Sequence, residues 1–593
     1  MLAARRMMAF AWAADRRHAC WTFALLSVQA IVASLISLWL RVFADSVTGH
    51  RGQTTLLAAL AIALSLSVTA AVDYAGNRTQ MTLGDRTQHL LNSRLLRLVS
   101  GSPTLAIHQT PGYLRELELL QLESWEIGQA VPAITEAVTT AVRIMITAVL
   151  LASVSPLLLV LPLFGLPALA LSRQTADLFN RGNELAAEPA RRAEMLYELA
   201  ASRGAAAELR LYRLRGELLR RFGAEHQAIR DIHVRLALRG QAFRLAGRAV
   251  FLAGYLGAIA AVTYLASRRA VSIGDVAMTA VLAGQTLTLV TGSAEHMHWL
   301  RRTLMAANRY VRLERFAGDS GARSAQEVTS TVPGLLADGI RLEAVSYCYP
   351  GHDRPTLRDV TVALPAGSTV AIVGDNGAGK STLVNLLAGL CRPTSGRILV
   401  DGTDLATLDP EEWRLRISAG FQDHARFEFS IQRAVGLGQL PALDDPVAVA
   451  GALDRAAAAS IVAKAPAGLA TQLGTAWPGG VELSGGEWQK LAIGRALMRP
   501  EPLLLLLDEP TAAIDAEAEH DLFQRWTRAA REVRQRAGAI TVLVSHRLAT
   551  VRMADLIIVL HDGRVSEHGS HDQLIAKGGR YAGLFELQAR GYR

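Results

Sequence analysis

Residues 374–382 read Gly374-Asp375-Asn376-Gly377-Ala378-Gly379-Lys380-Ser381-Thr382, and they follow the apolar run 369–373, Thr-Val-Ala-Ile-Val. A Gly-x-x-x-x-Gly-Lys-Ser pattern between a buried strand and a helix is typical of a phosphate-binding loop. Its glycines let backbone N–H groups curl around phosphates, and the helix N-terminus adds positive potential. The helix is predicted over 382–390. The chain has only four lysines, at positions 380, 464, 490 and 577. A lysine kept at the motif position therefore strengthens this interpretation.

The loop predicts ATP and Mg²⁺ as ligands. Lys380 is expected to reach the β- and γ-phosphates, and the Ser381 hydroxyl is expected to ligate Mg²⁺. The residues predicted to surround the phosphates are Gly374, Asn376, Gly377, Ala378, Gly379, Lys380, Ser381 and Thr382.

Two carboxylates follow a second strongly apolar segment. Residues 503–507 are five leucines, and Asp508-Glu509-Pro510 comes next. A run this apolar predicts a central strand, whose end brings both carboxylates to the edge of the sheet. We predict that Asp508 holds Mg²⁺, usually through water, and that Glu509 is the general base that polarises the attacking water.

A third motif, Leu483-Ser484-Gly485-Gly486-Glu487, stands about 20 residues before these carboxylates. Its glycines permit close backbone approach, and Ser484 is suited to cap the helix predicted over 488–498 or to hydrogen-bond an anion. Alone it would be an ordinary helix start. Its position before Asp508 and Glu509 favours a nucleotide-contacting role for Ser484, Gly485 and Gly486.

The first 300 residues have a different character. The chain has 593 residues, half of them apolar, and this length predicts more than one domain. Six apolar stretches reach the roughly 17–25 residues that cross a bilayer. They lie near residues 22–42, 55–76, 130–152, 156–172, 247–266 and 275–297.

The distribution of arginine predicts the orientation of these spans. Both long connections, 77–129 and 173–246, are rich in Arg, which keeps loops in the cytosol. Arg268 and Arg269 in a predicted outer loop are the exception. We therefore predict a multi-pass protein of the bacterial cytoplasmic membrane with both termini in the cytosol, the N-terminus being an uncleaved lead-in. The net charge of +9 is explained by these loops, so nucleic-acid binding is not expected.

The long connections keep helical periodicity and predict arms that project on the order of 50 Å, at 1.5 Å per residue. Their tips are predicted near 111–120 and 205–214, as contact points for a soluble motor. The polar segment 317–338 is the predicted linker. The predicted domains are thus an all-α six-helix membrane domain over 1–316 and an α/β domain with a largely parallel sheet over 339–593. Its strands are expected at 340–349, 359–364, 368–373, 397–400, 503–508, 541–544 and 556–560.

With these motifs in place, residues 340–593 resemble the nucleotide-binding domain of ATP-binding cassette (ABC) proteins, and the whole chain resembles an ABC exporter half-transporter. The resemblance implies four further roles. Tyr349 would stack on adenine, with Tyr347 as second candidate, and Gln422 would touch Mg²⁺ and sense the membrane arms. Asp515 would belong to the D-loop, and His546 would contact the γ-phosphate.

Two positions depart from the pattern of that family. The signature ends in Glu487 where Gln is commonest. Residues 424–428, His-Ala-Arg-Phe-Glu, differ from the sequence commonest in exporters at this place. The second departure is similar to a bacterial subgroup tied to peptide or natural-product export, with multidrug export also open.

The family resemblance also implies a dimer. The phosphate loop of one chain and the signature of its partner would sandwich ATP, the partner being a second copy or a paralogous half-transporter in the same bilayer. Candidate cargo contacts are the polar residues inside spans, for which packing or snorkelling is the alternative. These are Arg143, Glu295, His296 and His298.

Three functions remain open at this point. The first is ATP-driven export of an amphipathic small molecule, lipid or peptide. The second is ATP-driven import on an exporter-like scaffold, as in some siderophore systems. The third is a soluble ABC ATPase of chromosome maintenance or translation, which the short outer loops and the Arg asymmetry disfavour. The three cysteines, Cys20, Cys348 and Cys391, form no CxxC pair, so neither a disulfide framework nor a zinc site is predicted.

Overall fold

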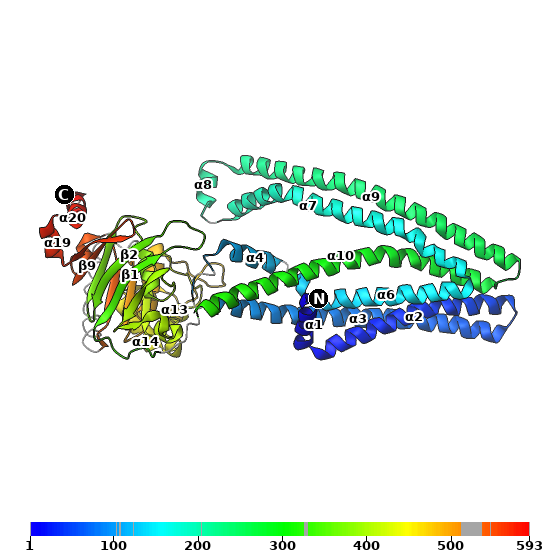
Figure 1. Cartoon of the computed structure of the whole chain (residues 1–593), viewed down its shortest axis with the longest axis horizontal. Coiled ribbons are helices and arrows are strands. Elements are labelled where there is room, and N and C mark those ends of the chain that lie inside the picture. The colour runs from blue at the N-terminus through cyan, green and yellow to red at the C-terminus, as the bar shows by residue number, and fades with distance from the viewer. Residues whose placement is uncertain are drawn as a thin grey trace. The chain divides into compact units, whose positions relative to one another are not determined.

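The computed structural model describes residues 2–101, 104–105, 108–122, 124–202, 204–324, 330–510, 537–545 and 547–591. The chain divides into two compact units, shown in Figure 1. A helical unit contains Met1–Arg97 and Glu118–Arg312, and an α/β unit contains Leu98–Leu117 and Leu313–Arg593.

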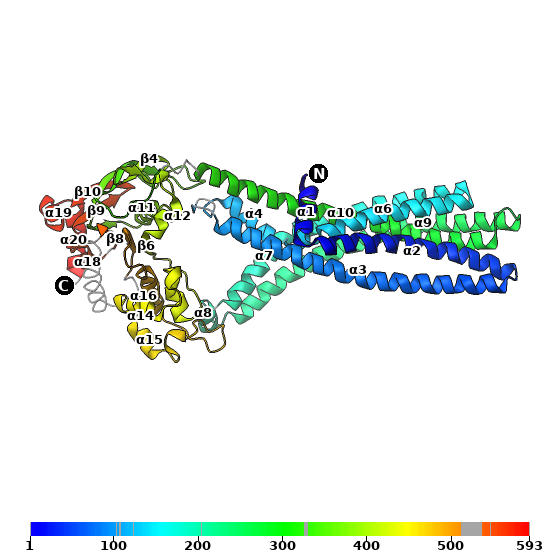
Figure 2. The ribbon, with the colours of Figure 1, turned by 90° about the horizontal axis from the view of Figure 1, so that it is seen from below.

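Within the described residues, the helical unit has six helices long and apolar enough to cross a membrane, which confirms the six predicted spans. They are α2 (Arg16–Thr48), α3 (Gly52–Ser100), α6 (Ala130–Val154), η1 (Pro156–Phe164) continuing into α7 (Gly165–Ala201), α9 (Arg215–Ser267) and α10 (Ile273–Ser324). The short helix α1 (Leu2–Ala14) precedes them. Figure 2 shows that the parts of α7 and α9 next to α8 (Ala206–Leu211) run together, away from α3 and α10, whereas the other half of α9 packs against α10.

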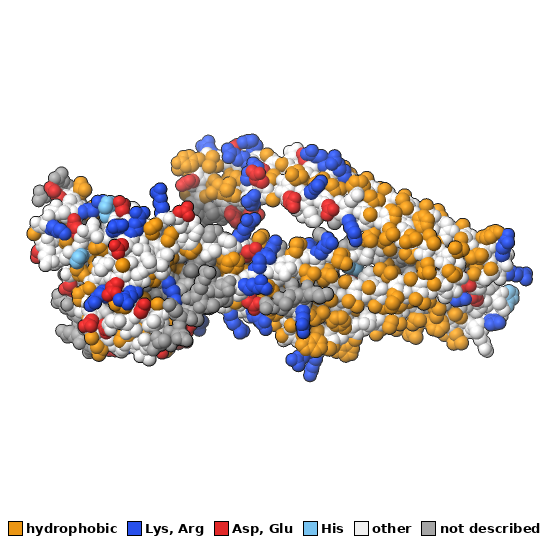
Figure 3. Space-filling model, viewed as in Figure 1, with side chains coloured by type: hydrophobic (Ala, Val, Ile, Leu, Met, Phe, Trp, Pro, Cys, Tyr) orange, Lys and Arg blue, Asp and Glu red, His pale blue; other side chains and the backbone are white. Residues whose placement is uncertain are grey.

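The surface of the helical unit suits contact with lipid. Leucines in the first third of α3 stay exposed, Leu64 by 66%. Figure 3 shows hydrophobic side chains spread over the side of the bundle that holds the short loops, while Lys and Arg gather along α7 and α9 beyond it. Exposed apolar helix faces of this length belong in a bilayer, so this is a multi-pass membrane protein.

Small residues allow α9 to pack closely on η1 and α7. Gly240, Gly247 and Gly254 recur at every seventh position of α9, and a Cβ at Gly247 would lie 2.8 Å from the Cα of Ala168. A Cβ at Gly254 would lie 2.5 Å from the ring of Phe164. Membrane helices associate through such small-residue seams, because lipid supplies little hydrophobic drive between helices.

Polar bonds tie α2 to the start of α10 at the end of the bundle that carries the short loops. The Asp45 carboxylate accepts the backbone N–H of Gly274 at 2.7 Å and the Ser272 hydroxyl at 2.9 Å. Arg41 Nε lies 2.9 Å from Asp275 Oδ1, and Asp275 is 5% exposed. A carboxylate at a helix N-terminus is favourable because the dipole there is positive.

The α/β unit contains two sheets among its described strands. The six-stranded sheet has the order β10-β9-β3-β8-β7-β6, parallel except for β10, and the four-stranded antiparallel sheet has the order β2-β1-β4-β5. The largest hydrophobic core draws on both sheets and on α11. The bounds are β1 (Gly339–Tyr347), β2 (Leu357–Pro365), β3 (Thr369–Gly374), β4 (Ser395–Val400), β5 (Thr403–Asp404), β6 (Ile417–Gly420), β7 (Leu504–Asp508), β8 (Ile540–Val544), β9 (Leu556–His561) and β10 (Arg564–Gly569).

All seven predicted strands are present, and their order explains the site. Because β3, β8 and β7 are adjacent and parallel, their carboxyl ends meet at one edge, where parallel sheets bind ligands. Sequence analysis missed β5, β6 and β10. Helices α13 (Ile431–Gly436), α14 (Pro446–Arg455), α15 (Ala459–Lys464) and α16 (Gly485–Ala496) form a second core with one face of β7 and β8.

Two segments differ from their predicted positions. The first arm turns between α3, which ends at Ser100, and α4 (Pro111–Leu122), so its tip precedes the predicted 111–120. The second arm turns at α8 (Ala206–Leu211), within the predicted 205–214. Helix α10 continues to Ser324, beyond the predicted start of the linker at 317, although Gly318 and Gly321 lie in this stretch.

Candidate nucleotide-binding site

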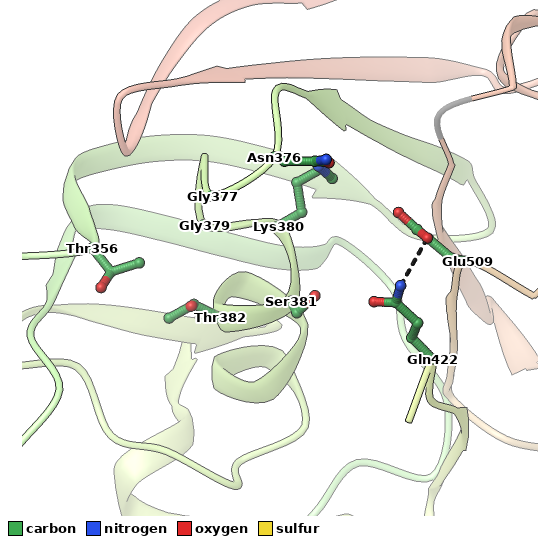
Figure 4. Close-up of a pocket in the computed structure, with 9 residues that line it drawn as sticks. All are labelled: Thr356, Asn376, Gly377, Gly379, Lys380, Ser381, Thr382, Gln422 and Glu509. Atoms are coloured by element: carbon green, nitrogen blue, oxygen red, sulfur yellow. Dashed lines mark hydrogen bonds between the residues drawn. The ribbon is translucent and has the colours of Figure 1, made fainter. Parts of the chain in front are cut away.

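A cavity of about 650 Å³ opens at the carboxyl ends of β3 and β7. It gathers most of the residues predicted from two distant motifs, and Figure 4 shows them around one space. The residues that line it are Thr356, Asn376, Gly377, Gly379, Lys380, Ser381, Thr382, Gln422 and Glu509. Its volume lies within the roughly 300–1,000 Å³ of small-molecule sites. Thr356 was not predicted, because the β1–β2 turn that carries it has no distinctive motif.

The phosphate loop has the backbone that its glycines permit. Gly379 has φ +98° and immediately precedes α11 (Lys380–Leu387). A Cβ at Gly379 would lie 2.6 Å from Leu357 Cδ2, so a larger residue is excluded by space as well as by φ. Gly374 ends β3, and the predicted Ala378 is buried between them. The loop therefore presents backbone N–H groups at the start of a helix, an arrangement suited to anions.

The Lys380 ammonium hydrogen-bonds back to the start of the loop that carries it. Its Nζ donates to the backbone carbonyls of Gly374 and Asp375, at 3.0 Å each, and the residue is 8% exposed. The hydrogen-bond partners that the described residues give this buried ammonium are neutral carbonyls, so it is poised for an anionic partner, because charge-assisted bonds are stronger. Asp375 itself turns outward and pairs with Arg580 at 2.7 Å.

Asp508 is a buried carboxylate at the end of β7. It is 5% exposed, and burial raises its pKa, although a hydrogen bond with Ser381 acts in the opposite direction. No described residue hydrogen-bonds to its Oδ1 atom. An unpaired buried carboxylate oxygen is costly, so this atom requires a partner that the described protein groups do not provide.

Glu509 reaches the cavity from an unusual backbone conformation. Its φ is +47°, which is rare for a residue with a side chain. The backbone is fixed by its N–H, which donates to Val544 O, and by its carbonyl, which accepts from Gln489 Nε2, both at 3.0 Å. Gln422 Nε2 donates to Glu509 Oε2 at 3.0 Å, which Figure 4 shows as a dashed line. Backbone strain of this kind persists where the surroundings enforce it, and it often marks active sites.

Two supporting residues were missed by sequence analysis. Gln489 is 6% exposed and holds the Glu509 carbonyl from the signature helix α16. Arg495, on the same helix, donates to Ala434 O at 2.8 Å and stacks over the Phe427 ring at 4.4 Å. Burial lowers the pKa of Arg495 to about 10. Its signal was a lone Arg in the apolar segment 491–497 of that helix.

The signature motif forms a helix start of its own, outside this cavity. Ser484 is the N-cap of α16, and it forms a capping box with Glu487. Glu487 Oε2 accepts the backbone N–H of Ser484 at 2.9 Å and its hydroxyl at 2.8 Å, and the backbone bond holds the pKa of Glu487 below its usual value. Within the part of the chain that the structure describes, no atom lies within 4 Å of a Cβ added at Gly485, so this end of the helix is open to an approaching group.

The two aromatic candidates for the adenine contact, Tyr347 and Tyr349, lie in different surroundings. Tyr347 is 5% exposed and donates its hydroxyl to Gln109 at 3.0 Å, whereas Tyr349 is half-buried and shares a 3.0 Å bond with Thr382 beside the phosphate loop. Tyr349 remains the predicted adenine contact. Asp515 and His546 lie outside the described residues, so their predicted roles stay predictions.

Comparison with known proteins agrees with this geometry. Residues 357–512 match the sequence model of the family described as ABC transporter. The chain is 41% identical over 252 residues to the mycobactin import ATP-binding/permease protein IrtB of Mycolicibacterium smegmatis, covering 42% of this chain and 41% of that protein. It is 41% identical over 249 residues to an ATP-dependent lipid A-core flippase of Burkholderia orbicola, covering 42% and 40%. The chain thus matches about two fifths of the length of these relatives.

A solved structure extends the comparison to the whole chain. A bacterial Atm1-family ABC exporter with ATP bound aligns with a TM-score of 0.76, covering 97% of this chain and 99% of that one at 24% identity. At this identity the likeness concerns the fold. Residues 357–512 therefore belong to the ABC transporter family, and the chain as a whole has the fold of an ABC exporter half-transporter.

Proposed function

We propose that this protein hydrolyses ATP to export an amphipathic small molecule, lipid or peptide across the bacterial cytoplasmic membrane. The observation that carries the proposal is the cavity that joins Lys380, Ser381, Gln422 and Glu509 in a chain that also has six membrane-grade helices. A soluble ABC ATPase would not need the exposed apolar faces of those helices.

The residues of the cavity divide the chemistry among them. Lys380 and the N–H groups of the loop bind the β- and γ-phosphates, and they stabilise the charge that develops during phosphoryl transfer. Glu509 accepts a proton from the attacking water, and the Gln422 amide orients its carboxylate. Tyr349 supplies the ring for adenine, beside Thr382.

Ser381 and Asp508 would hold Mg²⁺. The fit rests on the buried Asp508 Oδ1, which no described residue satisfies, and on the hydrogen bond that joins the two side chains. Oxygen ligands of this type suit a hard cation that also binds phosphate oxygens. When bound, Mg²⁺ would neutralise charge on the phosphates.

We propose that two chains complete each ATP site. Ser484 and the open N-terminus of α16 are suited to an anion, yet among the described residues that line the cavity none belongs to the signature. A partner's γ-phosphate would supply that anion, so ATP would be sandwiched between two copies, with a paralogous half-transporter as the other possible partner. Shifting the ratio of closed to open dimers from 1:99 to 99:1 needs about 5.5 kcal/mol, which two bridging nucleotides can supply.

The first arm offers a route from nucleotide to membrane. Its tip belongs to the α/β unit: Leu105 N donates to Leu390 O at 2.8 Å, and Gln109 Oε1 accepts from Tyr347 at 3.0 Å. Leu390 follows α11, whose first residues are Lys380 and Ser381. Movement of the phosphate loop therefore has a short covalent and packed path to the arm, which continues as α3.

Import is the second candidate, because one relative at 41% identity is named a mycobactin import protein. Direction is tested in inside-out vesicles that contain the protein, using a panel of labelled amphiphiles. ATP-dependent accumulation within these vesicles supports export, and ATP-dependent depletion supports import. Absence of any ATP-dependent flux, with ATP hydrolysis also absent and the protein folded in the vesicles, would refute both.

A further inference from the structure

A second cavity, of about 430 Å³, lies inside the helical unit between α2, α3, α6 and α10. Its lining combines polar and apolar side chains. These are Leu26, Gln29, Val72, Asp73, Gly76, Asn77, Gln80, Pro132, Glu136, His296 and Trp299. With His296 neutral, the two carboxylates give this lining a formal charge of −2. Of the predicted cargo contacts His296 is present and Arg143 is not, while the side chains of Glu295 and His298 lie outside the described set.

The cavity lies far from the short loops on all four helices. Counted at 1.5 Å per residue, Gln29 lies about 29 Å from the α2 end at Thr48, and Glu136 about 27 Å from the α6 end at Val154. Both helix ends carry the short loops. Given a hydrocarbon core of about 30 Å, the cavity therefore lies in the part of the spans farthest from the short loops, on the cytosolic side in the proposed orientation.

Its carboxylates stand on two separate walls. On one wall, Gln29 Nε2 donates to Asp73 Oδ1 at 2.5 Å, joining α2 to α3. On the other, Glu136 Oε1 lies 3.7 Å from His296 Nε2, and Thr140 Oγ1 lies 3.1 Å from His296 Nδ1, joining α6 to α10. The Gln29 amide thus orients Asp73, and the His296 ring lies beside Glu136. Charged groups within a membrane-spanning bundle are costly unless a cavity or partner uses them.

The arrangement suits an organic cation better than a metal ion. Among the described residues, no group of three His, Cys, Asp or Glu side chains lies close enough to hold a metal. A larger ligand could reach both walls, with amine or guanidinium donors for the carboxylates and an apolar body for Leu26 and Trp299. The Trp299 indole adds a face on which a cation can stack.

We propose that this cavity binds the cargo and selects an amphiphilic organic cation that carries amine or guanidinium groups. The inference rests on the proposed transport function and names its substrate class. Asp73 and Glu136 supply the charge selectivity, and Gln29 positions Asp73. Anionic amphiphiles would meet the two carboxylates and be rejected.

The test uses the full-length protein in lipid nanodiscs and two fluorescent probes, rhodamine 6G as the amphiphilic cation and fluorescein as the anion. Binding is followed by fluorescence anisotropy, and empty nanodiscs supply the lipid background. Asp73→Asn and Glu136→Gln keep shape and hydrogen bonds while removing one charge each. We expect each to weaken rhodamine binding about five- to tenfold, and the pair about 50-fold, because hydrogen bonds to charged groups are the stronger. Glu188→Gln, on the exposed part of α7, is the matched control and should leave binding unchanged.

The outcomes separate this inference from the proposed function. Unchanged rhodamine affinity in the double variant, or fluorescein bound more tightly than rhodamine by the unaltered protein, would overturn the cation site. Basal ATP hydrolysis of the unaltered protein is measured in the same nanodiscs as an independent test of the ATPase. If ATP hydrolysis persists while cation selectivity fails, the transporter proposal stands and the substrate class is wrong.

Discussion

Replacement of Glu509 by glutamine removes the proposed base while keeping its shape. The glutamine Oε1 atom can still accept the Gln422 amide now 3.0 Å from the carboxylate, and the backbone bonds to Val544 and Gln489 do not involve the side chain. General-base catalysis contributes about 10²–10⁴ to rate. We therefore expect kcat to fall by that factor, which corresponds to about 2.7–5.4 kcal/mol of activation free energy.

ATP affinity should change little in Glu509→Gln, by about threefold or less, because the phosphate-binding groups remain and the lost bond is replaced. The assay is phosphate release from the protein in nanodiscs, with binding of a fluorescent ATP analogue measured on the same samples. Glu428→Gln is the matched control, since Glu428 accepts Trp477 Nε1 at 3.0 Å and does not line the cavity. A Glu509→Gln protein that keeps more than about a tenth of the normal kcat would refute the role of Glu509 as base.

Three further expectations concern charges around the ATP site. Lys380→Ala should raise the Kd for ATP about 10- to 150-fold in equilibrium binding, as expected for loss of a charge-assisted bond of about 1.5–3 kcal/mol; unaltered affinity would contradict this. Glu487→Gln preserves the capping box but removes a negative charge beside Ser484, so it should lower the ATP concentration at half-maximal hydrolysis; a rise would contradict the proposed approach of a phosphate. Arg580 lowers the pKa of Asp375 in the folded protein below its unfolded-state pKa of 3.8. Their ion pair therefore stabilises the fold at pH values above 3.8, and this contribution is lost as the pH falls through the lower folded-state pKa. Because both groups are partly exposed, Arg580→Gln should lower the free energy of unfolding by less than about 1 kcal/mol at neutral pH. A difference in thermal unfolding between the variant and the unaltered protein that grows on acidification would contradict the pairing.

The parts predictable from sequence are those whose physics is local. The six spans follow from apolar length, and the phosphate loop follows from glycines between an apolar strand and a helix. The convergence of Lys380 and Glu509 follows from parallel strands that end at one edge. The span and loop patterns involve neighbouring residues, and the convergence follows from a general rule of parallel sheets, so one sequence is enough to recognise them.

The parts that were missed depend on tertiary contacts. Strand β6 has only four residues, Ile417–Gly420, and it pairs with β7 without any turn signal that sets it apart. Gln489 supports Glu509 across 20 positions of sequence, and spacing alone does not show that contact. The turn of the first arm was missed for another reason: α3 ends at Ser100, directly before Gly101 and Pro103, a helix-stop signal that the predicted tip did not use.

In the proposed dimer, each ATP is held by the phosphate loop of one chain and the signature of the other. This arrangement is tested in heterodimers isolated through two different affinity tags, with Glu509→Gln in both chains so that bound ATP is retained. One heterodimer carries Lys380→Ala in one chain and Ser484→Arg in the other; the second carries both changes in a single chain. Shared sites predict that the first retains one ATP and the second none. The reverse result, one ATP in the second heterodimer and none in the first, would show that each chain builds its own site.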